Sequence, residues 1–128
     1  MRNLHNNAQT AMHSERLLDH FQNPRNAGEL EAATVRVDVE NPACGDQMRL
    51  TARVENGVVA AVRYKVRGCT ASIAAGSALT EWLTGRSVKE AAGLRSDDIE
   101  RALGGLIPES KHAAVLCVDA ARELARRA

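Results

Sequence analysis

The chain has 128 residues, which is enough for one domain with a hydrophobic core that needs no disulfides. Its 17 Lys and Arg against 16 Asp and Glu give no reason to expect binding to nucleic acid or to a membrane surface. No run of residues approaches the roughly 20 apolar residues of a membrane span. The 3 cysteines are an odd number and the polar N-terminus does not resemble a signal peptide, so we expect reduced thiols in a cytoplasmic protein.

The first part of the chain predicts a tail followed by a short helix. Residues 1–13 are polar and are expected to form a flexible tail before a single domain at 14–128. Ser14 is a suitable N-cap for an amphipathic helix over 15–22. We expect this helix to end before Pro24, because the residue that precedes a proline avoids helical backbone angles.

The next segments predict a β-meander. Apolar and charged residues alternate over 35–40 and again over 48–55, which is typical of strands with one buried face. Asn56-Gly57 follows and is the strongest short signal for a β-hairpin, because a type I′ turn needs positive φ at both central positions. A returning strand is predicted over 58–66. We therefore expect three antiparallel strands with one apolar and one charged face.

Two longer helices are predicted after the strands. Residues 69–84 contain no proline and many small residues, which would let a helix lie close to its neighbours, and Gly85 is a suitable C-cap. The last helix is predicted over about 111–126. Its apolar stripe has helical spacing and consists of Ala114, Cys117, Val118, Ala121 and Ala125.

Two capping-box patterns, Ser87 with Glu90 and Asp97 with Glu100, predict two short helices between the longer ones. Strands that come first and helices that come afterwards are typical of the α+β class. We expect a three-stranded antiparallel sheet with the helices packed on one face.

Four candidate ligands lie at the predicted ends of elements, where a fold can bring side chains from distant parts of the chain together. Cys44 and Asp46 precede the second strand, and Cys69 and His112 stand at helix starts. The helix N-terminus favours a thiolate at Cys69. Two thiolates, an imidazole and a carboxylate suit tetrahedral Zn²⁺, and thiolates with imidazole also hold iron–sulfur clusters. The spacing alone equally suits a turn cysteine, a capping cysteine and a surface histidine.

Longer motifs favour a metal or iron–sulfur cluster site over these structural roles. They are LLDHFQNPRNAG at 17–28, PACGD at 42–46, VRYKVRGCTASIAAGSALTEWLTGRSVKEA at 62–91 and KHAAVLCVDA at 111–120. In this order they resemble motifs of the IscU/NifU/SufU family of iron–sulfur cluster assembly scaffolds, and the chain resembles a NifU N-terminal domain. The resemblance implies a SufE/NifU-like α+β fold and a scaffold or carrier rather than an enzyme.

By this resemblance, Cys44, Asp46, Cys69 and His112 take the positions of the family's ligands to a transient [2Fe–2S] cluster or to Zn²⁺. The implied partners are a cysteine desulfurase that supplies sulfur and apo-proteins that accept the cluster, and the implied state is a monomer or homodimer. The aspartate is implied to keep the cluster labile, since hard carboxylate oxygen is a poorer partner for cluster iron than thiolate.

The sequence departs from the family pattern at Ala113, where the family has a third cysteine directly after the histidine. Cys117 shares a helix face with Ala113, but its place on the apolar stripe favours a buried core cysteine over a ligand. Some members of the family carry an LPPVK-like stretch that an Hsp70-type chaperone reads. The matching segment here, LIPES at 106–110, keeps Pro108 but lacks the second proline and the basic residue, so the resemblance does not support chaperone-assisted transfer.

Ala113 motivates a rival prediction and a third interpretation. The rival is a zinc-binding scaffold-fold partner or regulator of cysteine desulfurase that no longer assembles clusters. The third interpretation is an engineered substitution of a normal scaffold at this position.

Overall fold

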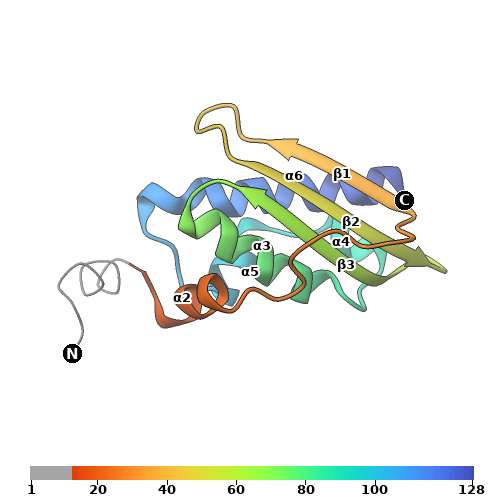
Figure 1. Cartoon of the computed structure of the whole chain (residues 1–128), viewed down its shortest axis with the longest axis horizontal. Coiled ribbons are helices and arrows are strands. Elements are labelled where there is room, and N and C mark those ends of the chain that lie inside the picture. Colours follow the sequence, from red (N-terminus) through yellow and green to blue (C-terminus); the bar gives the residue numbers. More distant parts are fainter. Residues whose placement is uncertain (1–12) are drawn as a thin grey trace.

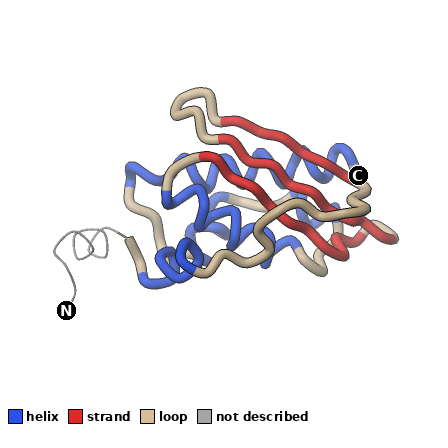
Figure 2. Tube along the Cα trace, in the orientation of Figure 1, coloured by secondary structure: helices blue, strands red, loops and turns tan. Residues whose placement is uncertain are grey.

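The computed structural model describes residues 13–128. In chain order the elements are α2 (Glu15–Gln22), β1 (Val35–Glu40), β2 (Gln47–Glu55), β3 (Val58–Arg67), α3 (Thr70–Leu83), α4 (Val88–Ala92), α5 (Ser96–Ala102), the 3-10 helix η1 (Pro108–Ser110) and α6 (Lys111–Arg127). The strands pair antiparallel in the order β1-β2-β3, and α3 and α6 lie behind them in Figure 1. Figure 2 shows the same two layers of strands and helices. The predicted α+β architecture is confirmed, and the predicted tail lies outside the described residues except for His13.

The β2–β3 hairpin turns where the sequence predicts. Asn56 and Gly57 have φ angles of 53° and 75°, the positive values that a type I′ turn needs. In the resulting register Val37 lies opposite Leu50, and Leu50 lies opposite Tyr64. All three side chains are buried on the face that the helices cover. The hairpin therefore sets the register in which the apolar side chains of β2 and β3 face the helices.

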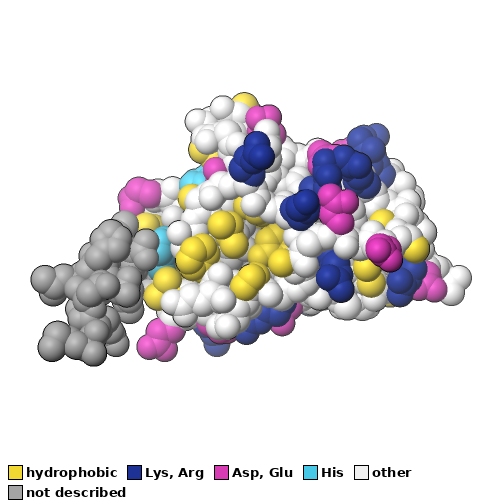
Figure 3. Space-filling view, viewed as in Figure 1, with side chains coloured by type: hydrophobic (Ala, Val, Ile, Leu, Met, Phe, Trp, Pro, Cys, Tyr) yellow, Lys and Arg dark blue, Asp and Glu magenta, His cyan; other side chains and the backbone are white. Residues whose placement is uncertain are grey.

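The outward face of the sheet carries charged side chains, which are Arg36, Asp38, Arg49, Arg63 and Lys65. Figure 3 shows basic and acidic side chains interspersed where the strands lie. Arg49 Nε lies 2.8 Å from Asp38 Oδ1, but both side chains are partly exposed and such pairs stabilise a protein little. This face of the sheet is therefore charged, with residues of both signs, as the alternation in the sequence predicts.

The core fills the space between the sheet and helices α3 and α6, and its largest fully buried side chains include Leu50, Leu79, Leu83, Leu116 and Leu124. Gly76 of α3 lies directly against the ring of Tyr64 on β3, where a Cβ atom would overlap the ring. The Tyr64 hydroxyl donates to the carbonyl of Ile73 at 2.8 Å. Small residues thus bring α3 close to β3, as predicted. Within residues 13–128, no helix has the length and apolarity needed to cross a membrane.

One of the two predicted capping boxes is present and the other is not. The Ser87 hydroxyl accepts from the N–H of Glu90 at 3.0 Å, and the Glu90 carboxylate accepts from the N–H of Ser87 at 3.0 Å. The predicted cap at Asp97 is wrong, because α5 already begins after Arg95. There the Asp98 carboxylate accepts from the Arg95 N–H at 2.9 Å, so an acidic residue in the first turn stabilises this helix start without an N-cap side chain.

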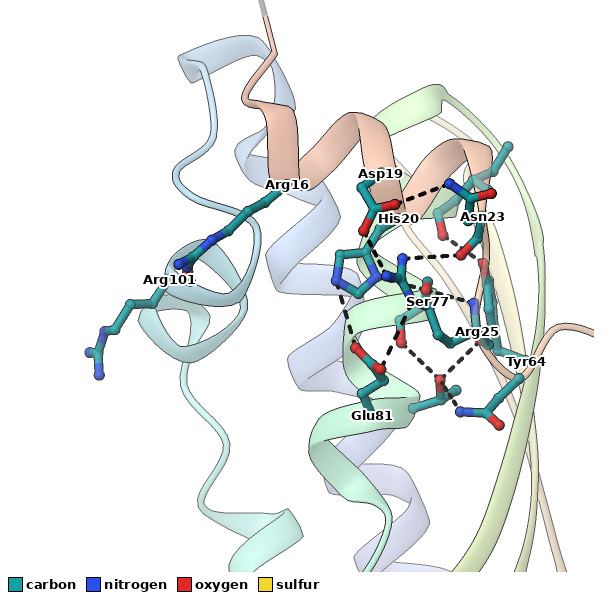
Figure 4. Close-up of polar contacts among 12 residues, drawn as sticks. Arg16, Asp19, His20, Asn23, Arg25, Tyr64, Ser77, Glu81 and Arg101 are labelled. Carbon is teal, nitrogen blue, oxygen red and sulfur yellow. Dashed lines mark hydrogen bonds and ion pairs between the residues drawn. The ribbon is translucent and has the colours of Figure 1, made fainter.

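Helix α2 and the segment after it are fixed on α3 by a polar network (Figure 4). Nδ1 of His20 lies 2.8 Å from the hydroxyl of Ser77, which also accepts from the Arg25 N–H at 2.9 Å. Nε2 of His20 lies 3.7 Å from a carboxylate oxygen of Glu81, and the Asp19 carboxylate pairs with the Arg25 guanidinium at 2.6 Å. This network joins the first described helix to the helix that carries Cys69 at its start.

Lowering the pH is expected to destabilise the protein through His20. Burial, followed by the nearby Arg25 charge, lowers the pKa of His20 below its usual 6.5. The unfolded chain then binds more protons than the folded chain, so the free energy of unfolding falls as the pH drops through 6.5 toward the folded pKa. Urea unfolding between about pH 8 and about pH 5 measures this slope. A His20→Gln variant should show a smaller slope, and equal slopes would contradict the prediction.

Candidate metal centre

Three segments meet at one end of the sheet, on the left of Figure 1: the β1–β2 loop and the starts of α3 and α6. The loop carries Cys44 and Asp46, Cys69 is the N-cap of α3, and His112 is the second residue of α6. The sequence placed these residues at element ends, and the fold brings those ends together.

The four predicted side chains form one cluster that is joined through Asp46 and His112. Ligand atoms of Cys44, Asp46 and His112 lie within 4.8 Å of one another. The Cys69 sulfur lies 3.5 Å from Asp46 Oδ2 and 3.4 Å from His112 Nε2, and that nitrogen lies 3.3 Å from the same Asp46 oxygen. Ligands of one tetrahedral metal ion lie about 3.3–3.8 Å apart when the metal–ligand bonds are about 2.0–2.3 Å long. The contacts of Cys69, Asp46 and His112 therefore have the spacing of a metal site.

Hydrogen bonds within the β1–β2 loop aim Cys44 and Asp46 at the helices. The Gly45 N–H donates to the Asn41 carbonyl at 2.7 Å, and the Asn41 N–H donates to the Asp46 carbonyl at 2.8 Å. The Asn41 side chain accepts from the Ala43 N–H at 2.9 Å. Gly45 has a φ of 78°, which L side chains rarely adopt. The glycine of PACGD thus makes the turn that places a thiol and a carboxylate on the same side.

Asp46 is the most enclosed member of the cluster, with 7% of its surface exposed. Burial opposes ionisation of its carboxyl group, but hydrogen bonds from Ser72 and Cys69 and the charge of His112 outweigh it. The pKa of Asp46 is consequently lower than its usual 3.8. At neutral pH this side chain is an anionic oxygen ligand, which suits hard metal ions better than soft ones.

Two residues that the sequence did not single out hold Asp46 in place. Ser72, one turn after Cys69, is fully buried, and its hydroxyl donates to Asp46 Oδ2. A Cβ atom at Gly68 would lie 2.6 Å from Asp46 Cγ, so the carboxylate occupies space that only glycine leaves open. The i, i+3 spacing of Ser72 from Cys69 and the glycine at a strand–helix junction were the available signals.

The three cysteines differ in exposure. Cys44 and Cys69 are exposed, whereas Cys117 is fully buried and lies among the core residues of α6. Burial raises the pKa of the Cys117 thiol, so its thiolate is disfavoured. Ala113 is also fully buried, although it directly follows His112. The assignment of Cys44, Asp46, Cys69 and His112 as ligands stays a prediction, and the structure places these four residues at the same end of the sheet.

A family model and several named proteins match most of the chain. The NifU-like N terminal domain family model matches residues 12–126. The chain is 39% identical over 111 residues to the iron-sulfur cluster assembly scaffold protein IscU 1 of Archaeoglobus fulgidus, across 87% of this chain and 72% of that one. It is 39% identical over 118 residues to the IscU scaffold protein of Azotobacter vinelandii, across 89% and 91%. With the bifunctional protein NifU/MnmA of Rubrobacter xylanophilus it shares 48% identity over 107 residues, but spans only 22% of that protein's length.

Solved structures share the fold. A putative iron-sulfur cluster assembly scaffold protein for the SUF system from Fervidobacterium islandicum superposes with a TM-score of 0.72 at 17% identity, over 90% of this chain and 97% of that one. A NifU-like N-terminal protein from Brucella abortus superposes with a TM-score of 0.60 at 21% identity, over 89% and 81%. The resemblance drawn from the motifs is confirmed by the family model and by the identity to IscU relatives that the chain covers over most of their length. The chain belongs to the NifU-like N-terminal domain family.

Proposed function

We propose that this chain is an iron–sulfur cluster assembly scaffold, a non-enzymatic carrier on which a cluster is built and from which it passes to acceptor proteins. The observation that carries this proposal is the convergence of Cys44, Asp46, Cys69 and His112 at one end of the sheet. Its context supports it, because relatives that align over most of their length are named scaffold proteins.

The cluster we infer is [2Fe–2S], held transiently. Each iron of such a cluster has two bridging sulfides and needs two protein ligands, so four ligands complete it. Cys44 and Cys69 would supply thiolates, and Asp46 with His112 would supply the remaining two. A set with one oxygen and one nitrogen binds cluster iron less tightly than four thiolates, which favours release. The exposure of both cysteines leaves the site open to delivery of iron and sulfur.

The partners we propose are a cysteine desulfurase as sulfur donor and apo-proteins as acceptors, in the cytoplasm. A monomer has the four ligands that one cluster needs, and a homodimer would bring further thiolates to it. The LIPES segment does not support an Hsp70-type chaperone as a further partner.

A second candidate function rests on Ala113. With an alanine there and Cys117 in the core, only two of the 3 cysteines lie at the site. Two thiolates, one imidazole and one carboxylate can complete tetrahedral Zn²⁺ without any cluster. On this alternative, the protein is a zinc-binding partner or regulator of cysteine desulfurase that no longer assembles clusters.

Anaerobic reconstitution separates the two functions. The unmodified chain is incubated with ferrous iron, cysteine, a cysteine desulfurase and a thiol reductant that reduces the delivered persulfide sulfur to sulfide. Bound iron, sulfide, zinc and visible absorption are then quantified. We expect a cluster with equal iron and sulfide that is transferred to an apo-ferredoxin. Stoichiometric zinc without a cluster would contradict this and support the alternative.

Two variants test in the same reconstitution whether a cysteine at position 113 improves cluster binding. Ala113→Cys should hold more cluster than the unmodified chain, because it adds a thiol directly after His112. Ala114→Cys is the matched control, since Ala114 is equally buried but lies about 100° further around the helix. If a cluster forms only on Ala113→Cys, assembly has been lost from the unmodified chain.

A further inference from the structure

The first turn of α3 contains a buried hydroxyl that none of the proposed ligand roles uses. Ser72 is fully buried, and its Oγ atom lies 3.5 Å from the Cys69 sulfur while donating to Asp46 Oδ2. The Cys69 sulfur lies 3.5 Å from that same oxygen. Ser72, Cys69 and Asp46 therefore form a triangle of contacts, and His112 Nε2 lies 3.3 Å from the same Asp46 oxygen.

Two residues outside the proposed ligand set, Gly68 and Ser72, restrain the Asp46 carboxylate. The absence of a side chain at Gly68 leaves room for it, because a Cβ atom there would lie 2.8 Å from Oδ1 and 2.9 Å from Oδ2. Ser72 then fixes its rotation, since the single hydroxyl proton is directed at Oδ2. This is the oxygen that also contacts Cys69 and His112. Gly68 thus provides space, and Ser72 determines which oxygen faces the other ligands.

We propose that Ser72 is a positioning residue of the metal centre, whose hydroxyl holds Asp46 Oδ2 toward Cys69 and His112. This inference rests on the proposed function, because it assumes that the four residues bind metal. Hydrogen-bond partners of metal ligands orient those ligands, and their loss typically lowers metal affinity about 10–100-fold. Removal of the Ser72 hydroxyl frees the carboxylate to rotate out of the site.

The same helix supplies a matched control. Ser77 is also fully buried, but its hydroxyl contacts His20 and the Arg25 N–H, on the side of α3 that faces α2. Ser72→Ala and Ser77→Ala are the same chemical change in the same helix at the same burial. A merely structural role for buried serines in α3 predicts similar effects of the two changes on metal binding.

The test is a titration of the whole chain with Co²⁺ alone, followed by its visible absorption, which reports thiolate ligation and tetrahedral geometry. We expect Ser72→Ala to weaken Co²⁺ binding about 10–100-fold, and Ser77→Ala to leave it unchanged. In an Asp46→Ala background, Ser72→Ala should add no further loss, because the positioning acts through that carboxylate. Equal weakening by the two serine variants, or full weakening in the Asp46→Ala background, overturns the proposal.

A second pair of variants covers the case in which Ser72→Ala does not fold. Ser72→Thr and Ser72→Val have nearly the same shape, but only threonine keeps the hydroxyl. We expect the threonine variant to bind Co²⁺ about 10–100-fold more tightly than the valine variant. Equal affinities of the two variants overturn the proposal. Cluster reconstitution is a separate measurement, so a chain whose Co²⁺ affinity depends on the Ser72 hydroxyl but which assembles no cluster contradicts only the proposed function.

Discussion

Replacing Gly68 with alanine is expected to weaken metal binding at the site by about 100-fold, the upper end of what changes around metal ligands cost. The new Cβ atom would lie 2.6 Å from Asp46 Cγ, a separation that real Cβ atoms essentially never show. The carboxylate must therefore leave its position beside Cys69 and Ser72. Because Gly68 does not have positive φ, alanine causes no backbone strain, and the effect is confined to the displaced carboxylate.

Isothermal titration with Zn²⁺ measures the effect of Gly68→Ala, and circular dichroism verifies the fold. Gly93→Ala is the matched control: Gly93 has a φ of −92°, and a Cβ atom there would meet only the Glu90 carbonyl at an ordinary 3.5 Å. The control should bind Zn²⁺ like the unmodified chain. If Gly68→Ala also does so, Asp46 does not need its observed position, and its role as a ligand is contradicted.

Single substitutions of Cys69 and Cys117 are expected to affect different properties: the first lowers metal affinity and the second lowers stability. Cys69→Ala should reduce Zn²⁺ affinity by more than about 100-fold, since loss of a ligand costs more than loss of its hydrogen-bond partner. It should change the free energy of unfolding of the metal-free protein little, because Cys69 is exposed. Cys117→Ala should leave the affinity unchanged but cost about 1 kcal/mol of stability, because it removes one fully buried heavy atom.

Zn²⁺ titration and urea unfolding of both variants complete this comparison. Retained affinity in Cys69→Ala would exclude Cys69 as a ligand and remove one of the two thiolates that the scaffold function needs. Loss of affinity in Cys117→Ala would instead show that α6 rearranges on binding, because the buried Cys117 sulfur would have to reach the site.

Several elements followed from short-range signals. The Asn56-Gly57 turn and the Ser87–Glu90 capping box formed as predicted, because each depends on backbone preferences and hydrogen bonds within a few residues. The start of α5 was misplaced for a related reason. Asp97 and Asp98 are both acidic and adjacent, and α5 begins two residues earlier than a cap at Asp97 requires, so Asp98 is the residue that accepts from the Arg95 N–H.

The candidate site was predicted in its members but not in its arrangement. Motif resemblance and position at element ends singled out Cys44, Asp46, Cys69 and His112, and these lie together. Neither signal distinguishes Asp46 as the enclosed member on which Cys69, Ser72 and His112 converge. That convergence depends on how closely α3 approaches β3.

The sequence by itself determined the α+β class, the hairpin, the family and the residues that are candidates for binding metal. Each of these depends on periodicity, turn chemistry or ordered motifs, which are properties of neighbouring residues. Only the tertiary structure decided that Gly68 and Ser72 position Asp46, and that Cys117 is enclosed by the core while Cys69 faces solvent. The physical reason is packing: contacts between residues far apart in the chain depend on how closely β3, α3 and α6 approach one another, and no local pattern encodes that distance.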